Sequence, residues 1–206
     1  MTNEKIPSRK VKILAAHISA LIAPPVPARF QVLDVGCGDG LIDKLIMDSG
    51  NNVSITGCDV LVRSKTHIPV QEFDGRHLPY ADNSFDGVLF SDVLHHTLNP
   101  FELLKEAARV SRQYIFIKDH LLEGPLAFHR LKFMDWVGNS RFGVSLPYNY
   151  WSEVQWRDAF KALDLDIKEW NGSLKLYPWP FDYCFGRTLQ FITKVEKTSY
   201  MVTNIF

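Results

Sequence analysis

The chain has 206 residues, 46% of them hydrophobic, and its 23 basic and 23 acidic side chains leave no formal net charge. Balanced charge argues against broad electrostatic binding to nucleic acid, which needs a basic surface. The three cysteines make no disulfide framework and contain no C-x-x-C pair of the kind found in zinc sites. Residues 1–12 lack the apolar run of a signal peptide, and no apolar stretch reaches the ~18 residues of a membrane span. We therefore expect one cytoplasmic α/β domain over residues 1–206.

Apolar residues at helical spacing predict a first helix over residues 9–22, which the proline-rich residues 23–27 end. This helix and its flanks form an expected N-terminal helical segment, residues 1–29. Short apolar runs then alternate with helical patterns. Strands are predicted at residues 30–35, 53–58, 70–73, 86–91, 114–117, 165–170 and 189–195, and further helices at 41–47, from 100 onward and at 152–163. The alternation predicts an α/β fold with a Rossmann-like, doubly wound sheet of seven strands.

Two of the predicted helices carry the sequence features of a capped N-terminus. Asn99 is expected to cap the helix that begins at Pro100, because Glu102 stands three residues after it. Ser152 and Gln155 have the spacing of a capping box. These features predict where both helices begin.

The alternation of strands and helices breaks after Asp119. Residues 120–150 form a predicted lid-like insertion, too densely apolar for one narrow helical stripe. Its aromatic side chains are Phe128, Phe133, Trp136, Phe142, Tyr148 and Tyr150. Such a segment either completes the core or covers an apolar ligand, since aromatic lids commonly close over hydrophobic substrates. Contact with a membrane surface or with another subunit is a third interpretation.

A glycine-rich turn follows the first predicted strand and opens the next helix. Gly36, Gly38 and Gly40 alternate along it, so the backbone can turn tightly and a ligand can approach it without meeting a Cβ. Asp34 stands two residues before the first glycine. This acid suits a ligand with a cation and would repel the pyrophosphate bound by the G-x-G-x-x-G turn of dinucleotide sites. Taken alone, the turn also fits a purely structural connection.

Two further acids stand at the ends of predicted strands. Asp59 ends the second strand, where a carboxylate can accept hydrogen bonds from ribose hydroxyls. Asp74 follows the third strand, and with Gly75 it is placed to bind the amino group and a ring nitrogen of adenine. Acids at three successive strand ends favour a ligand site over a purely structural turn.

Four segments together resemble the class I methyltransferases that use S-adenosylmethionine (SAM): DVGCGDG, GCD, EFDGRHLPYADNSFDGVLFSDVLHH and NPFELLKEAARVS. The resemblance covers residues 30–111 and is strongest to methyltransferase type 11 and the ubiquinone and menaquinone biosynthesis branch. It implies SAM as cofactor and S-adenosylhomocysteine as product. It implies Asp34, Gly36 and Gly38 at the methionyl part, Asp59 at the ribose, Asp74 and Gly75 at the adenine, and Ser91 or Asp92 near the sulfonium, with Cys37 and Val60 as further cofactor-binding residues.

The chain departs from these relatives after Val110. The relatives usually have a leucine, a proline and glycines before the fifth strand, whereas residues 111–114 read SRQY here. The difference concerns a turn and bears on the subfamily, not on the cofactor site.

Methyl transfer to an oxygen or a carbon acid needs a base, which is expected at the carboxyl ends of the strands. His95 and His96 follow the fourth strand, and Asp119 and His120 follow the fifth. We predict His120 as the first candidate because it leads into the insertion, with His95 second and Asp119 as a carboxylate that orients an imidazole. Each histidine could instead pack against the cofactor or cap a helix. A metal site formed by Asp92, His95, Asp119 and His120 is an alternative interpretation, but no ligand spacing on one helix face supports it, so no metal is expected.

The predicted function is methyl transfer to a small apolar or aromatic molecule, at oxygen or at carbon. One alternative is a SAM-binding scaffold or regulator without activity. Another is a protein or nucleic-acid methyltransferase, although residues 91–94 read SDVL where amino-group methylating relatives commonly have Asn/Asp-Pro-Pro-Tyr/Phe. The glycine spacing argues against an NAD-linked oxidoreductase. The sequence specifies neither the acceptor nor the oligomeric state.

Overall fold

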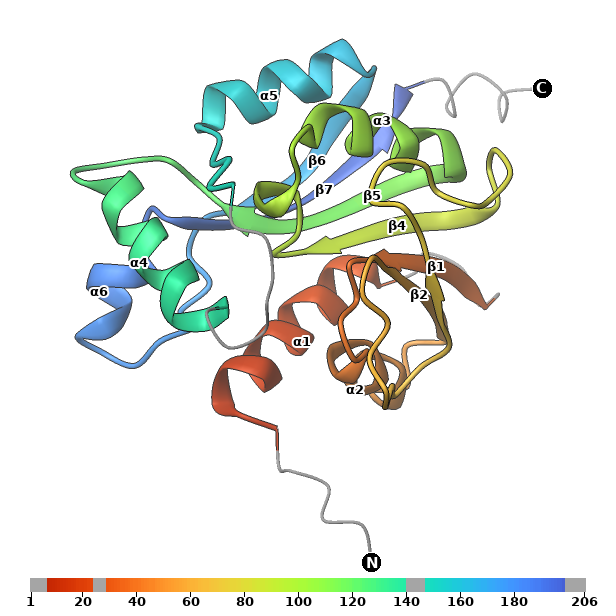
Figure 1. Cartoon of the computed structure of the whole chain (residues 1–206), viewed down its shortest axis with the longest axis horizontal. Helices are drawn as coiled ribbons and strands as arrows, with labels where there is room; N and C mark the ends of the chain where they lie inside the picture. Colours follow the sequence, from red (N-terminus) through yellow and green to blue (C-terminus); the bar gives the residue numbers. More distant parts are fainter. Residues whose placement is uncertain (1–6, 24–28, 140–146, 199–206) are drawn as a thin grey trace, which may run out of the picture.

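The computed structural model describes residues 7–23, 29–139 and 147–198, and Figure 1 shows a sheet with helices on both faces. Its helices are α1 (Arg9–Ile22), α2 (Leu41–Asp48), the short 3-10 helix η1 (Leu94–His96), α3 (Pro100–Val110), α4 (Ala127–Asn139), α5 (Glu153–Ala162) and α6 (Phe181–Phe185). Its strands are β1 (Phe30–Val35), β2 (Val53–Asp59), β3 (Val70–Glu72), β4 (Phe85–Ser91), β5 (Ser111–His120), β6 (Leu165–Asn171) and β7 (Gln190–Lys197). The predicted α/β class is confirmed. Residues 24–27, Phe142 and the tail from residue 199 lie outside the described residues.

The described strands form a seven-stranded sheet in the order β3-β2-β1-β4-β5-β7-β6. Neighbours from β3 to β5 pair in parallel, as the alternation of elements predicts. Strand β7 enters antiparallel between β5 and β6, with Tyr114 opposite Glu196 and His120 opposite Gln190. The carboxyl ends of β1, β2, β4 and β5 therefore meet at one edge, and the strand order reverses there between β1 and β4.

Both faces of the sheet are covered, because side chains alternate between the faces along each strand. On β4, Val88 and Phe90 pack in one core with α3 and α5, whereas Leu89 packs in a second core with α1 and α2. Figure 1 shows these two layers, with α3 and α5 above the sheet and α1 and α2 below it. All three β4 side chains are fully buried. The central strands are thus held from both sides and give the loops at their carboxyl ends a rigid base.

The predicted helix caps form. Asn99 Oδ1 accepts a hydrogen bond from the Glu102 amide at 3.4 Å, and Pro100 lies in the first turn of α3. Ser152 and Gln155 make the reciprocal capping box of α5. Both helices begin where the sequence predicts, because these side chains satisfy amides that have no partner within the helix.

Strand β5 is longer than predicted, since it covers Ser111–His120 and not only residues 114–117. Helix α3 ends at Val110 and the strand follows at once. Pairing with β4 on one side and β7 on the other extends the strand beyond its apolar run. Residues 111–114 therefore form strand and not the turn that the sequence comparison predicts, and the polar residues 118–120 belong to the strand itself.

The described part of the predicted insertion contains α4, which Figure 1 places with α6 beyond the carboxyl end of β5. Ala127 and Leu131 on the inner side of α4 are buried with Tyr150 and Leu189. The outer side leaves large side chains exposed: Phe128, Phe133, Trp136 and Val137. Completion of the core thus accounts for the inner side of α4 only. Among the described helices, none has the length and apolar character that crossing a bilayer requires.

Candidate active site

The carboxyl edge of the sheet gathers the residues predicted for cofactor binding and catalysis. The strand register pairs Val35 with Cys58 on one side and with Phe90 on the other, and pairs Ser91 with Lys118. The glycine turn, Asp59, Asp92 and Asp119 follow directly on these residues. An edge where the strand order reverses is the usual ligand site of an open α/β sheet.

The glycine turn after β1 has one closed side and one open side. Gly36 donates a hydrogen bond from its amide to the Cys58 carbonyl at 2.7 Å, and its φ of 78° lies in the left-handed region that favours glycine. A Cβ at residue 36 would lie 2.6 Å from Cγ2 of Val93, so only glycine lets the segment after β4 come this close. At Gly38, a Cβ would meet no described atom within 4 Å, which leaves room for a ligand.

Asp59 lies against this turn from the end of β2. Its Oδ2 accepts a hydrogen bond from the Gly38 amide at 2.8 Å, and its Oδ1 accepts one from the Leu61 amide at 2.9 Å. Each carboxylate oxygen keeps a second lone pair that can accept from a hydroxyl group. The structure therefore brings Asp59 and Gly38 together, and the role of Asp59 in ribose binding stays a prediction.

Asp34 and Asp43 form a buried acidic pair next to the turn. Asp34 is 3% exposed, and its Oδ1 has no hydrogen-bond partner among the described residues. Burial raises the pKa of Asp34 well above its usual range, and the charge of Asp43 adds to this. Burial also raises the pKa of Asp43 to about 6. The pair fits a site that receives a cation, because a positive charge would stabilise the ionised carboxylates. Sequence analysis missed Asp43, whose one signal is an acid in the apolar helix after the turn.

Asp74 is exposed and is engaged within its own turn. Its Oδ1 accepts hydrogen bonds from the amides of His77 and Arg76, each at 2.7 Å, and these bonds lower the pKa of Asp74 to about 2. A Cβ at Gly75 would lie 3.2 Å from Cγ1 of Val60, so these two predicted cofactor residues come together. Contact of Asp74 and Gly75 with adenine stays a prediction.

Asp92 follows β4 in a strained backbone conformation. Its φ of 60° costs a residue other than glycine about 1–3 kcal/mol. Lys118, which is fully buried, donates a hydrogen bond from Nζ to Oδ1 of Asp92. Burial works to raise the pKa of Asp92, but the charge of Lys118 holds it well below its usual range. Sequence analysis missed Lys118. The feature that could have identified it is a charged residue at the end of an apolar strand. The place of Ser91 or Asp92 near the sulfonium stays a prediction.

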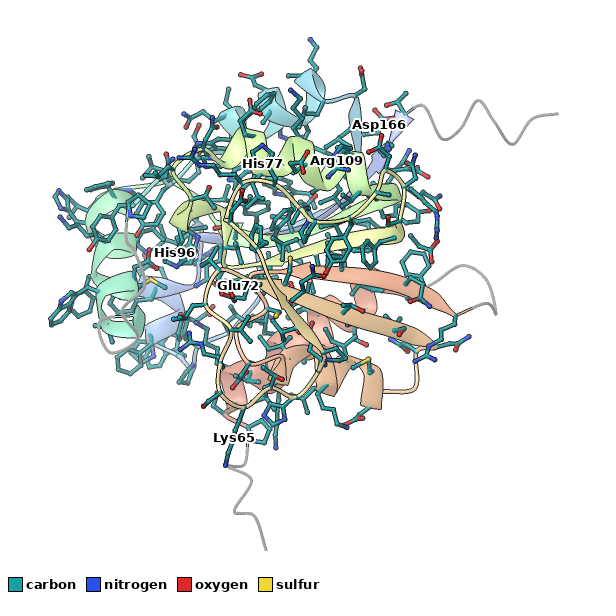
Figure 2. The ribbon with its side chains drawn as sticks, turned by 45° about the vertical axis from the view of Figure 1, so that its right-hand side comes forward. Lys65, Glu72, His77, His96, Arg109 and Asp166 are labelled. Atoms are coloured by element: carbon teal, nitrogen blue, oxygen red, sulfur yellow. The ribbon has the colours of Figure 1, made fainter. Side chains whose placement is uncertain are left out.

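Five polar residues, named here the His–Asp cluster, lie between the carboxyl ends of β4 and β5 and helix α4: His95, His96, Asp119, His120 and Asp135. Figure 2 labels His96 on the side of the sheet that faces α4. The ring centroid of His95 lies 4.0 Å from that of His96 and 4.4 Å from that of His120. The structure thus brings the three predicted catalytic residues together. It adds Asp135, an acid within a dense apolar run that sequence analysis did not identify.

His95 lies between two carboxylates. Its Nδ1 is 2.5 Å from Oδ1 of Asp119, and its Nε2 is 3.5 Å from Oδ2 of Asp135. Asp119 also accepts hydrogen bonds from the Leu94 amide at 3.0 Å and from the His120 amide at 2.7 Å. The hydrogen bonds of Asp119 therefore connect η1 to the end of β5.

Asp135 brings the insertion into the cluster. Tyr150 donates a hydrogen bond to Oδ2 of Asp135, and both residues are buried. His120 lies with Nε2 4.0 Å from Oδ1 of Asp135 and with Nδ1 3.3 Å from Oδ1 of Asp92. The His120 ring thus faces the strand end on one side and the insertion on the other.

The two neighbouring imidazoles of η1 have opposite pKa shifts. Burial works to lower the pKa of His95, but the charges of Asp119 and Asp135 raise it to about 10. Burial lowers the pKa of His96 to about 4, and the charge of His95 lowers it further. With no other cation in the cluster, His95 holds a proton at neutral pH and His96 stays neutral.

Comparison with known proteins bears on residues 33–114, which contain the glycine turn. Residues 33–114 match the family model described as a methyltransferase domain. The 27-O-demethylrifamycin SV methyltransferase of Amycolatopsis mediterranei is 30% identical over 101 residues, 43% of this chain and 37% of that protein. The demethylmenaquinone methyltransferase of Paenarthrobacter aurescens is 34% identical over 89 residues, 40% of this chain and 34% of that protein. Over residues 33–114, the chain is therefore similar to class I SAM-dependent methyltransferases.

The chain shares its fold with a solved SAM-dependent methyltransferase from Aquifex aeolicus, at a TM-score of 0.62 and 16% identity over 94% of each chain. At that identity the likeness concerns the fold alone. The chain spans little more than a third of the length of the two curated relatives. The matched region contains the glycine turn and His95 but ends before Asp119, His120 and Asp135. The His–Asp cluster is therefore completed by residues outside the matched methyltransferase region.

The residues of the matched region fit SAM. The unpartnered Oδ1 of Asp34 and the open side of Gly38 suit the methionyl part, whose ammonium group needs hydrogen-bond acceptors. The oxygens of Asp59 suit a ribose. These observations agree with the comparisons, which support SAM as the cofactor and an enzyme of the methyltransferase class.

Proposed function

We propose that this chain transfers the methyl group of SAM to an oxygen or carbon of a small apolar or aromatic molecule, with release of S-adenosylhomocysteine and a proton. One observation carries the proposal. Val93 packs against Gly36, so the segment that enters the His–Asp cluster touches the turn proposed to hold the cofactor. An acceptor bound at the cluster would lie beside the cofactor, and such alignment contributes much of the rate of a displacement reaction.

His120 is the proposed base, because His95, the second candidate from the sequence, already holds a proton at neutral pH and cannot take another. The 3.3 Å separation between Asp92 and Nδ1 of His120 favours the tautomer with its proton on Nδ1, which leaves Nε2 to accept one. Asp119 is proposed to position His95 and the His120 amide. SAM supplies an electrophilic methyl group when it is bound. The residues of the chain then orient the acceptor, take its proton and exclude water.

The acceptor is proposed to be apolar because α4 covers the cluster with apolar side chains. Leu131 and Tyr150 are buried there, and the ring of Phe128 lies 6.0 Å from that of Tyr150. Aromatic pockets commonly bind hydrophobic or aromatic ligands. The two relatives named above are described as methyltransferases of a demethylrifamycin and of a demethylmenaquinone, which supports a small-molecule acceptor.

The outer surface of α4 and α6 is proposed to contact a membrane surface, from which an apolar acceptor would enter. Exposed aromatic side chains lie on α4 (Phe133 and Trp136), on α6 (Phe181 and Tyr183) and just before α6 (Trp179). On α4, the exposed described residues include Lys132 and no acid, since Asp135 is buried. Aromatic and basic side chains together suit the boundary between lipid headgroups and acyl chains.

The test starts with calorimetric titration of the protein with SAM, S-adenosylhomocysteine and NAD. A turnover assay for S-adenosylhomocysteine follows, with phenols, quinols and apolar carbon acids as acceptors. Binding of the first two ligands together with turnover of an acceptor supports the proposal. Binding of SAM with no turnover on any of these acceptors would favour a scaffold or regulator. Failure to bind SAM would overturn the proposed function.

A further inference from the structure

The His–Asp cluster contains buried nitrogen atoms that its hydrogen bonds leave unpaired. Nε2 of His95 and Nδ1 of His96 have no hydrogen-bond partner in the part of the chain that the structure describes. Both nitrogen atoms are buried, and His95 is 2% exposed, so bulk water does not satisfy them. Buried polar atoms are nearly always hydrogen-bonded or bound to an ion or a water molecule. The unpaired nitrogens therefore indicate a missing partner.

Two groups of the cluster face each other at the spacing of two metal ligands. Nε2 of His95 and Oδ2 of Asp135 are 3.5 Å apart, which is long for a direct hydrogen bond between charged groups. Two ligands that each lie about 2.0–2.2 Å from a tetrahedral zinc ion are about 3.4 Å apart. One ligand atom each from His95, His96 and Asp135 lies within 4.8 Å of the others. The spacing fits a shared cation better than a direct pair.

A second side chain orients each of these two groups, His95 and Asp135. Asp119 lies 2.5 Å from Nδ1 of His95, which keeps one ring proton on Nδ1 and directs Nε2 toward Asp135, where a bound metal ion would replace the second ring proton. Tyr150 donates its hydroxyl hydrogen bond to Asp135. A histidine bound to a metal commonly gives its other N–H to a carboxylate, and a bound carboxylate is hydrogen-bonded in turn. The cluster has both of these supporting contacts.

We propose that His95, His96 and Asp135 bind a divalent first-row metal ion, with Asp119 and Tyr150 orienting two of the ligands. Two imidazoles and one carboxylate suit Zn²⁺, Co²⁺ or Fe²⁺. Three protein ligands leave a position open, as catalytic metal sites do. The expectation of no metal considered ligand spacing on one helix face, whereas the proposed site is shared between η1 and α4.

The open position would hold an oxygen atom of the methyl acceptor, within reach of His120, and this role rests on the proposed transfer. Metal binding itself needs neither SAM nor an acceptor. It is therefore tested on the protein alone, and SAM binding is measured in a separate titration.

The experiment is a titration of tag-free, chelator-treated protein with Co²⁺, followed by the visible absorption of the bound ion, and then by displacement with Zn²⁺. We expect one Co²⁺ per chain, with the absorption of a site of low coordination number. His96→Gln and Asp135→Asn remove ligands and should abolish these bands or shift them. Asp119→Asn removes a supporting contact and should weaken binding by about 10–100-fold. His129→Gln, at an exposed histidine of α4, is the matched control and should bind Co²⁺ as the wild-type chain does.

Circular dichroism shows which variants fold, and the half-buried position of His96 makes His96→Gln the mildest ligand change. The proposal is overturned if the folded wild-type chain binds neither Co²⁺ nor Zn²⁺. It is also overturned if folded His96→Gln keeps the wild-type affinity and absorption. SAM binding without metal binding would leave the proposed methyl transfer standing. Metal binding without SAM binding would overturn the proposed methyl transfer and would still support the proposed metal site.

Discussion

Val93 packs against Gly36 so closely that a Cβ at residue 36 would lie 2.6 Å from Cγ2 and 2.8 Å from Cγ1 of the valine. The next residue, Leu94, donates its amide hydrogen bond to Asp119 of the His–Asp cluster. The glycine turn is therefore linked to the His–Asp cluster through two consecutive residues, Val93 and Leu94. A substitution in the glycine turn should therefore alter the His–Asp cluster, and a substitution in the cluster should alter the turn.

Gly36→Ala should weaken SAM binding and lower the free energy of unfolding by about 1–3 kcal/mol, because the new Cβ is strained at positive φ and overlaps Val93. Gly50→Ala is the matched control, since residue 50 also has positive φ but its Cβ would meet no described atom within 4 Å. Urea unfolding and calorimetry with S-adenosylhomocysteine measure both effects. Equal losses in the two variants would show that the Val93 contact contributes nothing.

Asp59→Ala should weaken SAM binding by about 1–3 kcal/mol, which is roughly 5- to 150-fold in Kd, because ribose hydroxyls would lose their acceptor. Asp48→Ala removes an exposed acid of α2 that pairs with Lys44 and should leave SAM affinity unchanged. Calorimetric titration of both variants gives the comparison. Unchanged affinity in Asp59→Ala would exclude the ribose assignment.

Asp43 predicts a pH dependence of stability. Its folded pKa of about 6 lies above the usual unfolded value of about 3.9, so the folded chain binds this proton more tightly than the unfolded chain does. Its contribution to stability is therefore fully present below pH ~4 and is lost as the pH rises to ~6. Asp43→Asn cannot ionise and should be more stable than the wild-type chain by about 1–3 kcal/mol above this range, with no such gain at low pH.

Urea unfolding of the Asp43→Asn variant and of the wild-type chain across this pH range tests the sign of the stability difference. Asp48→Asn, at an exposed acid of the same helix, provides the control and should follow the wild-type profile. A stability difference that does not change with pH would mean that folding does not raise the pKa of Asp43.

His120→Ala should spare SAM binding and lower kcat by about 10²–10⁴-fold, the usual contribution of a general base. His129→Ala, at an exposed histidine of α4, should keep full turnover. The measurements are kcat for an accepted substrate and the Kd for SAM in each variant. Wild-type turnover in His120→Ala would leave His120 with a packing role only.

Replacement of Trp136 and Trp179 by alanine should lower binding to anionic lipid vesicles about tenfold or more, since burial of a large apolar side chain contributes about 1.5–3 kcal/mol. Val154→Ala changes an exposed apolar residue of α5, at 66% exposure, and should have no effect. Vesicle cosedimentation at low and moderate salt provides the measurement. If the wild-type chain does not sediment with vesicles, this surface serves some other contact.

Local sequence determined several features of this protein by itself. The α/β class, the helix caps at Asn99 and Ser152, and the glycine turn with Asp34 and Asp59 were all predictable. Each depends on residues within a few positions of one another, through hydrophobic period, amide capping or backbone freedom. The parallel pairing of the first strands follows from their alternation with helices, and the acids at the strand ends follow from that pairing.

The tertiary structure alone decided the rest of the site. Lys118 meets Asp92 because β4 and β5 are neighbours, and Asp135 meets His95 because α4 folds back over the strand ends. Strand β5 is longer than its apolar run because β7 pairs with it from the far end of the chain. Contacts of this kind join residues that are distant in sequence, so no local sequence pattern predicts them. The histidines at the strand ends were therefore readable from the sequence, and the carboxylates that set their charge and orientation were not.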